Sequence, residues 1–480
     1  MKQVIRFVSH LLLTLLMGMA LVGCGSDSFE EDIPVLPTGQ PVQVSLRIGV
    51  QEPQETGSRA WDNSQSRNEK DEKMYSWFVI IAQEERVVDI IEKNSVTDLE
   101  TDEVGTVTLA TGTYDFYSFA NIKRSSISDL ASLKKGQLMP DLSAVTYRVD
   151  GNGFAVKSQH IPMSNKQTFT ISATTTQVEL WVVRMLAKMT LRFTNATAHN
   201  ITITSATLSE ITANAPDNLK LLPVHIGDNS GKTGACTPNL SSAAKTEDYT
   251  YKPATAISVP ADKTEPVSMT FYINESAKPT QNAHGLFTLS LNTDKGVMRY
   301  ALITNENENW DFIARNDHRV IPVTLQDYRL DIIPYDWPPI GVYPASVKQE
   351  DGLFTVTFHS GGHFHLQPVV SKYGDNTHFS YGETGADTWS YVSWTRAGTI
   401  PEDFYEADNS TVDGCENGGV PVWDSANHFI FGNLKDTGIL PSGQTAPKAF
   451  HDLTVSVNTG GTPATRQLTY HLCIVKEITY

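Results

Sequence analysis

The sequence predicts an all-β protein built from tandem β-sandwich domains behind an export signal. Three observations predict this fold class: Thr- and Val-rich runs that alternate apolar and polar residues, punctuation of these runs by Gly, Asn and Pro, and scarce helical periodicity. Only Ser125–Leu133 has the pattern of a short helix. The 480 residues are 40% hydrophobic, which is enough for packed cores and too much for a disordered chain.

The charge and the motifs exclude several classes of function. Acidic residues number 54 against 37 basic ones, and a net charge of -17 argues against a nucleic-acid-binding protein, which needs clustered cations. The sequence contains no Gly-x-Ser-x-Gly elbow, phosphate loop or His-Glu-x-x-His motif. We therefore expect no enzyme activity, no cofactor and no resident metal.

The first 23 residues predict a lipoprotein signal peptide. Lys2 and Arg6 precede an apolar run that is too short for a permanent membrane span. The closing Leu21-Val22-Gly23-Cys24 resembles the bacterial lipoprotein signal, in which the cysteine is lipidated after cleavage. An ordinary signal peptide with a chance cysteine is the alternative. Acidic residues directly after Cys24 resemble the surface-export signal of Bacteroides-type lipoproteins, so we expect an outer-membrane precursor held by lipid on Cys24.

The first predicted strand spans Val42–Val50, where apolar and polar residues alternate without interruption. Its apolar side chains share one face: Val42, Val44, Leu46, Ile48 and Val50. Residues 51–73 lack apolar periodicity and predict an exposed loop. The strands predicted up to residue 325 are Tyr75–Gln83, Glu103–Ala110, Tyr114–Ile122, Gln167–Ala173, Gln177–Val183, Met185–Asn195, Asn200–Leu208, Ala256–Val259, Val267–Ile273, Gly285–Asn292, Val297–Asn305 and Val320–Leu325.

Composition changes along the chain predict the domain boundaries. Residues 24–59 form a lipidated propeptide with the first strand, and residues 60–174 form the first β-sandwich domain. The second sandwich spans 175–344 and ends in the Pro-dense Ile333–Pro344, because proline does not suit a central strand. Residues 345–480 are richer in Gly, His, Trp and Tyr, and predict a third β-domain.

Four short passages stand out between residues 40 and 330: Thr111–Asn121 (TGTYDFYSFAN), Ile161–Ser164 (IPMS), Arg184–Lys188 (RMLAK) with Asn195, and Ile303–Asn305 with Arg315–His318 (RNDH). In this order they resemble the fimbrillins, the pilus subunits of Bacteroides-type bacteria. Any single passage is a weak signal, whereas the ordered set is more specific. The resemblance implies transthyretin-like, immunoglobulin-like sandwiches in a pilus assembled from lipoprotein precursors.

The resemblance also implies proteolytic activation. In fimbrillins a trypsin-like, Arg-specific protease cuts after an arginine just beyond the first strand, and Arg59-Ala60 has that position here. Its polar surroundings suit entry into a protease cleft. Arg67 is a second possible cut site, and the alternative is that Arg59 is only a solvated loop residue.

Removal of Val42–Val50 would open an apolar groove flanked by unpaired backbone groups. A strand from another pilus subunit would fill that groove, as in donor-strand exchange. Two segments of this chain are candidate donors: Arg466–Tyr480, which we interpret as the last strand of the third domain, and Tyr328–Val342. An appended third domain suits a tip or accessory subunit better than a stalk subunit.

The third domain holds the remaining candidate sites. His359, His363 and His365 are close in sequence, and His363 and His365 predict one polar strand face, which we favour over a metal site because no carboxylate or cysteine completes the set. Several aromatic residues suit either core packing, which we favour, or contact with a glycan or protein ligand: Trp389, Tyr391, Trp394, Tyr405 and Trp423. Cys415 and Cys473 are a candidate disulfide pair, with Cys236 left over.

Two functions follow from these observations. The first is a structural and adhesive pilus subunit that starts as an outer-membrane lipoprotein and moves into the fimbrium after cleavage. The second is a surface glycan-binding lipoprotein, or a carbohydrate-active enzyme, that stays anchored through Cys24.

Overall fold

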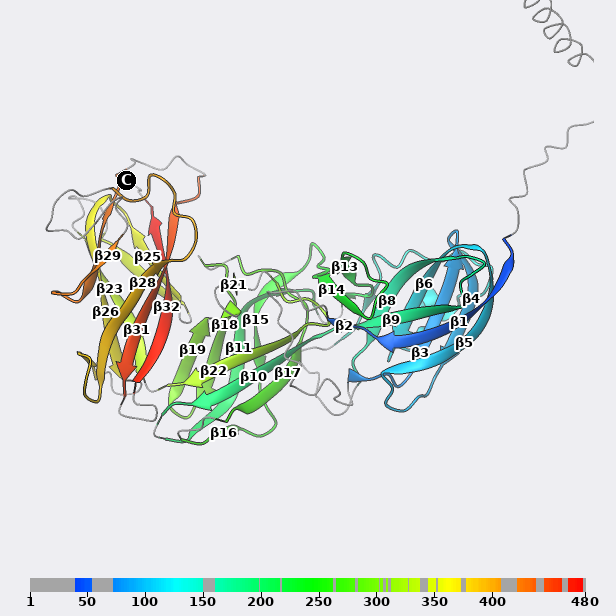
Figure 1. Ribbon diagram of the computed structural model, residues 1–480, viewed down its shortest axis with the longest axis horizontal. Helices are drawn as coiled ribbons and strands as arrows, with labels where there is room; N and C mark the ends of the chain where they lie inside the picture. The colour runs from blue at the N-terminus through cyan, green and yellow to red at the C-terminus, as the bar shows by residue number, and fades with distance from the viewer. Residues whose placement is uncertain are drawn as a thin grey trace, which may run out of the picture.

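The protein consists of three β-units that follow one another along its long axis (Figure 1). The structure is a computed structural model, and it describes residues 39–53, 72–149, 160–197, 199–215, 218–261, 265–280, 284–301, 303–304, 308–309, 312–326, 328–336, 344–350, 353–372, 377–406, 421–436, 444–459 and 465–477. The fold is nearly all β, as predicted. A 3-10 turn at Arg124–Ser126 and α2 at Ser128–Ala131 occupy the predicted short helix.

The first unit is a seven-stranded sheet that folds over on itself into a sandwich. Its halves meet where β8 and β9 pair through only two residue pairs, and their inner faces share one core. In sheet order the strands are β4 (Arg86–Lys93), β3 (Trp77–Gln83), β6 (Gly112–Ala120), β8 (Met163–Ile171), β9 (Gln177–Arg184), β1 (Pro41–Val50) and β5 (Thr101–Ala110).

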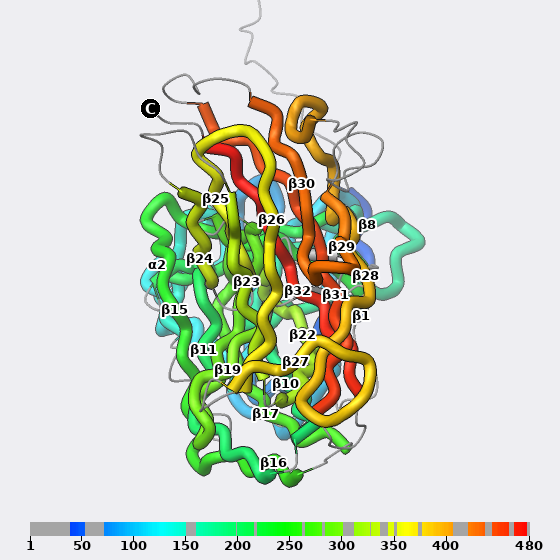
Figure 2. The backbone as a smooth tube through the Cα atoms, turned by 90° about the vertical axis from the view of Figure 1, so that its left-hand side faces the viewer, coloured from blue at the N-terminus to red at the C-terminus, as the bar shows by residue number. Residues whose placement is uncertain are grey.

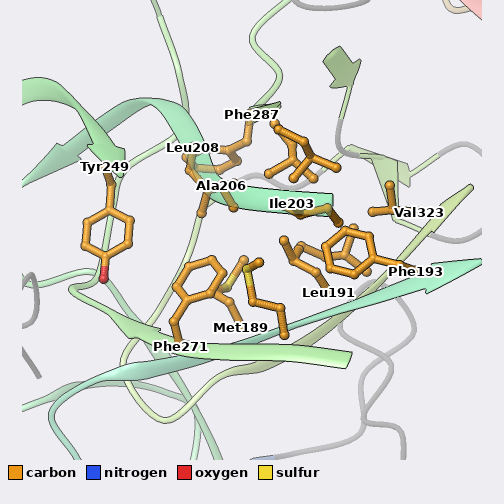
Figure 3. Packing of buried hydrophobic residues seen from close by; sticks show 14 of the residues in the cluster. Met189, Leu191, Phe193, Ile203, Ala206, Leu208, Tyr249, Phe271, Phe287 and Val323 are labelled. Carbon is orange, nitrogen blue, oxygen red and sulfur yellow. The ribbon is translucent and has the colours of Figure 1, made fainter. Parts of the chain in front are cut away.

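The second unit is a sandwich of a three-stranded and a five-stranded sheet around one hydrophobic core. Figure 3 shows Leu191 and Phe193 of one sheet facing Ile203 and Leu208 of the other. The smaller sheet has β17 (Val267–Ile273), β10 (Ala187–Asn195) and β22 (His318–Leu325). The larger has β15 (Lys245–Tyr251), β11 (Ile201–Ala213), β18 (Thr288–Thr293) and β19 (Gly296–Ala301), and β16 (Ile257–Val259) also pairs with β11.

The third unit is also a two-sheet sandwich. Its four-stranded sheet lies at the far end of the molecule, with β23 and β26 in front of β31 and β32 in Figure 2. That sheet has β23 (Tyr328–Asp336), β26 (Gly362–Lys372), β30 (Phe429–Leu434) and β29 (Val422–Asp424). The other has β24 (Ser346–Glu350), β25 (Leu353–Phe358), β32 (Thr465–Lys476), β31 (Lys448–Asn458), β28 (Thr388–Arg396) and β27 (Ser380–Tyr381).

Short pairings supplement these sheets, and two of them connect the first and second units. β7 (Thr146–Tyr147) pairs with β12 (Leu219–Lys220), and β2 (Glu52–Pro53) pairs with β14 (Thr233–Thr237). β13 (Val224–Ile226) also pairs with β14, and β20 (Ile303–Thr304) pairs with β21 (Glu308–Asn309).

Two predicted boundaries and one predicted loop differ from the structure. Gln177–Arg184 is a strand of the first sheet, because it pairs with β1 and β8, so the first unit extends past residue 174. Tyr328–Asp336 pairs with β26 and belongs to the third unit, so the second unit ends before residue 344. Gln51–Pro53, predicted as exposed loop, contains the fully buried Gln51.

Candidate functional site

The first strand of the chain lies inside its sheet. β1 pairs antiparallel with β5 from Pro41↔Ala110 to Gly49↔Thr101, and parallel with β9 from Ser45↔Gln177 to Val50↔Val182. A register shift between Leu46 and Arg47 interrupts the pairing with β5. Both edges of β1 are therefore hydrogen-bonded to strands that come later in the chain, and β1 fills a slot between them (Figure 1).

The side chains predicted for the buried face of β1 lie in the core of the first unit. Val44 and Leu46 are 0% exposed, Ile48 is 1% exposed and Val50 is 7% exposed, whereas Val42 is partly buried at the rim of the same core. They pack against side chains of the facing half of the sheet, among them Trp77, Val79, Ile81, Tyr114 and Phe116. Burial of the four core side chains contributes on the order of 6–12 kcal/mol before entropy costs.

The outer face of β1 has two different environments. Arg47 lies between two carboxylates, with its Nε 2.9 Å from Glu103 Oε1 and its Nη1 3.8 Å from Glu179 Oε1. These half-exposed ion pairs contribute little stability. Gly49 lies under the indole of Trp181, whose Cζ3 would be 2.5 Å from a Cβ at this position, so a larger residue requires Trp181 to move.

The other predicted processing residues lie outside the residues that the structure describes. This applies to Cys24, Arg59 and Ala60. The described part of the leading segment ends at Pro53, and Arg59 follows six residues later in the sequence. Among the described residues, no helix is long and apolar enough to cross a membrane.

Several residues of the quoted passages meet where the first and second units join. Lys188 Nζ lies 2.7 Å from Glu72 Oε1, Tyr272 donates to the same carboxylate at 2.7 Å, and Arg184 Nη2 lies 4.0 Å from its other oxygen. Arg184 also donates to Asn316 Oδ1 at 2.9 Å. All of these carboxylate contacts join residues that are distant in the sequence, which is why the sequence alone did not assign them a role.

Asn121 and Arg315 order the backbone next to this junction. Asn121 has a φ of 56°, and its side-chain amide donates to the carbonyls of Lys73 and Ile161 at 2.8 and 2.9 Å. Arg315 is buried and forms an ion pair with Glu275 at 2.6 Å, while its Nη2 donates to Lys220 O at 2.9 Å. Burial alone would lower the pKa of Arg315, but the adjacent Glu275 carboxylate raises it, so the guanidinium stays charged.

The aromatic residues of the third unit mostly pack inside it. Trp389 and Tyr405 are core residues, as the favoured interpretation predicted. Tyr391, Trp394 and Trp423 are partly buried against the same core, and the rings of Tyr391 and Trp423 stack at 4.6 Å. The faces of these aromatic rings are thus largely covered by other side chains of the third unit.

His363 and His365 share the outer face of β26, as predicted. The ring of His365 stacks between Tyr335 at 4.5 Å and Phe429 at 4.4 Å, and His363 lies 5.7 Å from Phe431. Burial lowers the pKa of His365. Among the described residues, no group of three or more His, Cys, Asp and Glu side chains is placed to hold a metal ion.

The cysteines differ from the candidate pairing. Cys473 is a buried free thiol in the core of the third unit, not part of a disulfide with Cys415, which lies outside the described residues. Burial raises the pKa of Cys473 to about 12, which keeps the thiol protonated and unreactive. Cys236 is buried beside His225, with its Sγ 3.8 Å from Nδ1.

Comparisons with known proteins gave matches only among solved structures. No family profile matches the sequence, and no curated protein matches it. The tip fimbrial protein Mfa3 from Porphyromonas gingivalis, with a C-terminal truncation, matches 59% of this chain over 95% of its own length, at 16% identity and a TM-score of 0.39.

Two further structures match in the same way. A fimbrilin (FimA) from Porphyromonas gingivalis W83 covers 60% of this chain and 89% of its own, at 13% identity and a TM-score of 0.32. A fimbrial assembly protein from Parabacteroides distasonis covers 71% of this chain and 98% of its own, at 11% identity and a TM-score of 0.29. The solved structures to which part of this chain is similar thus include fimbrial proteins.

Proposed function

We propose that this chain is a structural and adhesive pilus subunit that becomes competent for assembly when its leading strand is removed. The observation that carries the proposal is the position of β1, which fills a slot between β5 and β9 although it is the first described strand of the chain. The fimbrillin-like passages in the sequence agree with this function.

Cleavage after Arg59 would leave β1 attached only by non-covalent contacts. Its departure would expose the unpaired edges of β5 and β9, and an apolar groove where Val44, Leu46 and Ile48 had been. A strand donated by another subunit would restore both the backbone hydrogen bonds and the buried apolar surface. Proteolysis would thereby drive polymerisation without a nucleotide.

The third unit favours a tip or accessory position over a stalk position. Both candidate donor strands belong to this unit: β32 lies between β25 and β31, and β23 contributes Tyr328, Leu330 and Ile332 to the core. Donation of either strand would take apolar side chains out of that core. A subunit that accepts a strand without donating one suits the end of a fibre.

The same unit provides a surface for adhesion. The four-stranded sheet faces away from the rest of the molecule (Figures 1 and 2), and Ile333 and Tyr335 on β23 are 41% and 42% exposed. Exposed aromatic and aliphatic side chains suit a glycan or protein ligand of a host or bacterial surface. Before cleavage, lipid on Cys24 would hold the precursor in the outer membrane, and an Arg-specific protease would then release the body into the fimbrium.

N-terminal sequencing of surface-extracted protein tests the proposal directly. We expect a mature N-terminus at Ala60 and recovery in high-molecular-weight fibres. An Arg59→Gln variant should remain a lipid-linked monomer that starts at Cys24. Arg47→Gln is the matched control, because it removes an arginine within β1 and should leave fibre incorporation unchanged.

Two results would contradict this function. One is normal fibre incorporation of the Arg59→Gln variant with its leading strand still attached, that is, without cleavage at position 59 or at Arg67. The other is recovery of the natural protein only as a lipid-linked form with saturable sugar binding, which would favour an anchored glycan-binding lipoprotein.

A further inference from the structure

The leading segment does not stop at the edge of the first unit. Directly after β1, the short strand β2 pairs in parallel with β14 of the second unit, through Glu52↔Thr233 and Pro53↔Gly234. The backbone N–H of Glu52 donates to Lys232 O at 2.8 Å. Residues 41–53 thus form one extended run that contacts two domains.

Gln51 is the residue at which this run passes between the domains. Its side chain is fully buried, and its N–H donates to Val182 O at 2.8 Å. Its carbonyl accepts from Arg184 Nη1 at 3.3 Å and from Asn316 Nδ2 at 3.1 Å. Its side-chain amide donates to Gly231 O at 3.3 Å.

Groups of both the first and the second unit surround Gln51. A Cβ added to Gly234 would lie 2.6–2.9 Å from the amide atoms of Gln51, so glycine at this position leaves room for that side chain. Arg184 is held beside the Gln51 carbonyl by its contacts with Asn316 Oδ1 and with the Glu72 carboxylate. These receiving groups all follow Arg59 in the chain, so they would stay with the body after cleavage.

We propose that Gln51–Pro53 is an interdomain clasp, and that the strand which replaces the leading segment must reproduce it. This inference rests on the proposed function and adds a requirement on the partner. The partner is an extended polypeptide strand of about 13 residues that reaches the position of Pro53. It presents a main-chain N–H and C=O at the position of Gln51, and alternating apolar side chains before it.

A second requirement comes from Gly49. Because the Trp181 indole covers this position, the partner strand needs glycine there. The alternating strand β32, Thr465–Lys476, contains no glycine and is built into the third unit. β32 of a second copy therefore does not meet this requirement, and the partner is an extended strand with glycine at the position of Gly49.

Peptide binding to the full chain, cut after Arg59, tests the clasp. The probes are the synthetic peptide PVQVSLRIGVQEP, which corresponds to residues 41–53, the shorter PVQVSLRIGV, and the longer peptide with Gly49→Leu. Labelled peptides are exchanged for the resident segment in mild denaturant, and their dissociation constants are measured by fluorescence anisotropy. We expect the longer peptide to bind about tenfold more tightly than the shorter one, and the Gly49→Leu change to cost about tenfold.

Variants of the residues that contact Gln51 test whether the clasp causes the tighter binding of the longer peptide. Arg184→Met in the cut protein should reduce the advantage of the longer peptide to less than about threefold and leave binding of the shorter peptide unchanged. Asn316→Gly, which keeps the φ of 63° accessible, is a second test should Arg184→Met fail to fold. Lys135→Ala is the control and should leave the affinities of both peptides unchanged, because it removes an exposed ion pair with Asp89 at 2.8 Å that lies outside the clasp.

The outcomes separate this inference from the proposed function. Equal affinities of the two peptide lengths, with both bound in the groove, would overturn the clasp and leave donor-strand exchange intact. Binding of neither peptide, with the resident segment not exchangeable, would overturn both. Tight binding of the Gly49→Leu peptide would overturn the glycine requirement.

Discussion

At the scale of single residues, a buried charge pair stabilises the backbone next to the junction of the first and second units. Arg315 and Glu275 are both nearly inaccessible, and the Arg315 guanidinium contacts Glu275 through Nε at 3.1 Å and Nη2 at 2.6 Å. Arg315 Nη2 also donates to Lys220 O, next to the pairing of β12 with β7. The ion pair thereby joins the residues just before β22 to Glu275 and to the backbone of β12.

Arg315→Met should lower the free energy of unfolding by about 3–5 kcal/mol, because it leaves the Glu275 carboxylate buried without its cation. The double variant Arg315→Met with Glu275→Leu should recover at least about half of that loss, since no buried charge remains. Urea denaturation of the uncleaved chain measures both. Arg329→Ala, which removes a half-exposed pair with Asp331, is the control and should cost less than about 1 kcal/mol. Equal losses in the single and double variants would contradict this account.

His451 makes the third unit sensitive to acid. It is fully buried, its Nε2 lies 2.9 Å from Tyr405 Oη, and its ring stacks on Trp394 at 4.5 Å. Burial, and then the charge of Arg396, lower the pKa of His451 from 6.5 to about 4. The unfolded chain therefore binds a proton between these pH values that the folded chain does not bind, and acidification favours unfolding.

We expect His451 to account for about 2 kcal/mol of stability lost between pH 7 and pH 5, with the loss beginning as the pH falls through 6.5 and ending below about 4. In a His451→Gln variant this part of the pH dependence should disappear. Urea unfolding of the third unit at several pH values, followed by tryptophan fluorescence, measures it. His359→Gln is the matched control, and an unchanged pH dependence in His451→Gln would rule out this role.

The sequence identified individual residues of the candidate site more readily than the residues that they contact. It singled out Arg184, Lys188 and Arg315 as parts of the fimbrillin-like passages, yet it did not predict that Lys188 would contact Glu72 or that Arg315 would contact Glu275. Gln51 and Asn316 are hydrogen-bonded although 265 positions apart. Such contacts arise from domain packing, about which local periodicity carries no information.

At the scale of secondary-structure elements, the leading strand β1 is the most important part of the fold, because its side chains complete the core of the first unit. Val44, Leu46 and Ile48 sit in the middle of the first core, whereas Val42 lies at its rim. The strand's stability in its slot should therefore come from its central residues.

Leu46→Ala should lower the free energy of unfolding by about 2–5 kcal/mol, because it opens a cavity at a fully buried position. Val42→Ala, on the same face of the strand, should cost less than about 1 kcal/mol because Val42 is only partly buried. Guanidinium unfolding of the uncleaved chain, monitored by circular dichroism, compares the two variants. Equal costs would mean that β1 is not inserted in the core as described.

The alternation of residues 42–50 was sufficient to predict β1 and its buried face. It was not sufficient to predict the neighbours of β1, because β9 follows it by about 130 residues and pairs in parallel, a contact that no turn signal announces. The sequence also missed β4, Arg86–Lys93, where the paired apolar residues Val87-Val88 and Ile90-Ile91 break the period of two. The interpretation of Arg466–Tyr480 as a strand of the third domain agrees with β32.

The three units are coupled unequally at the scale of the whole molecule. The first and second share one hydrophobic cluster, to which the first contributes Phe78 and Phe119 and the second contributes Leu219, Leu221 and Tyr272. Between the second and third units, the described contacts involve fewer residues. His284 Nε2 lies 3.1 Å from Phe354 O, the His284 and Phe450 rings lie 5.6 Å apart, and Arg466 Nη2 donates to Ala196 O at 2.8 Å.

This difference predicts two transitions in differential scanning calorimetry of the uncleaved chain, one for the first two units together and one for the third. Phe358→Ala, at a buried position of the third core, should lower only the Tm of the third-unit transition, by roughly 10 °C. Leu221→Ala, in the shared cluster, should lower only the other transition. A single transition that both variants shift would mean that the contacts of His284 and Arg466 couple the third unit as strongly as a shared core does.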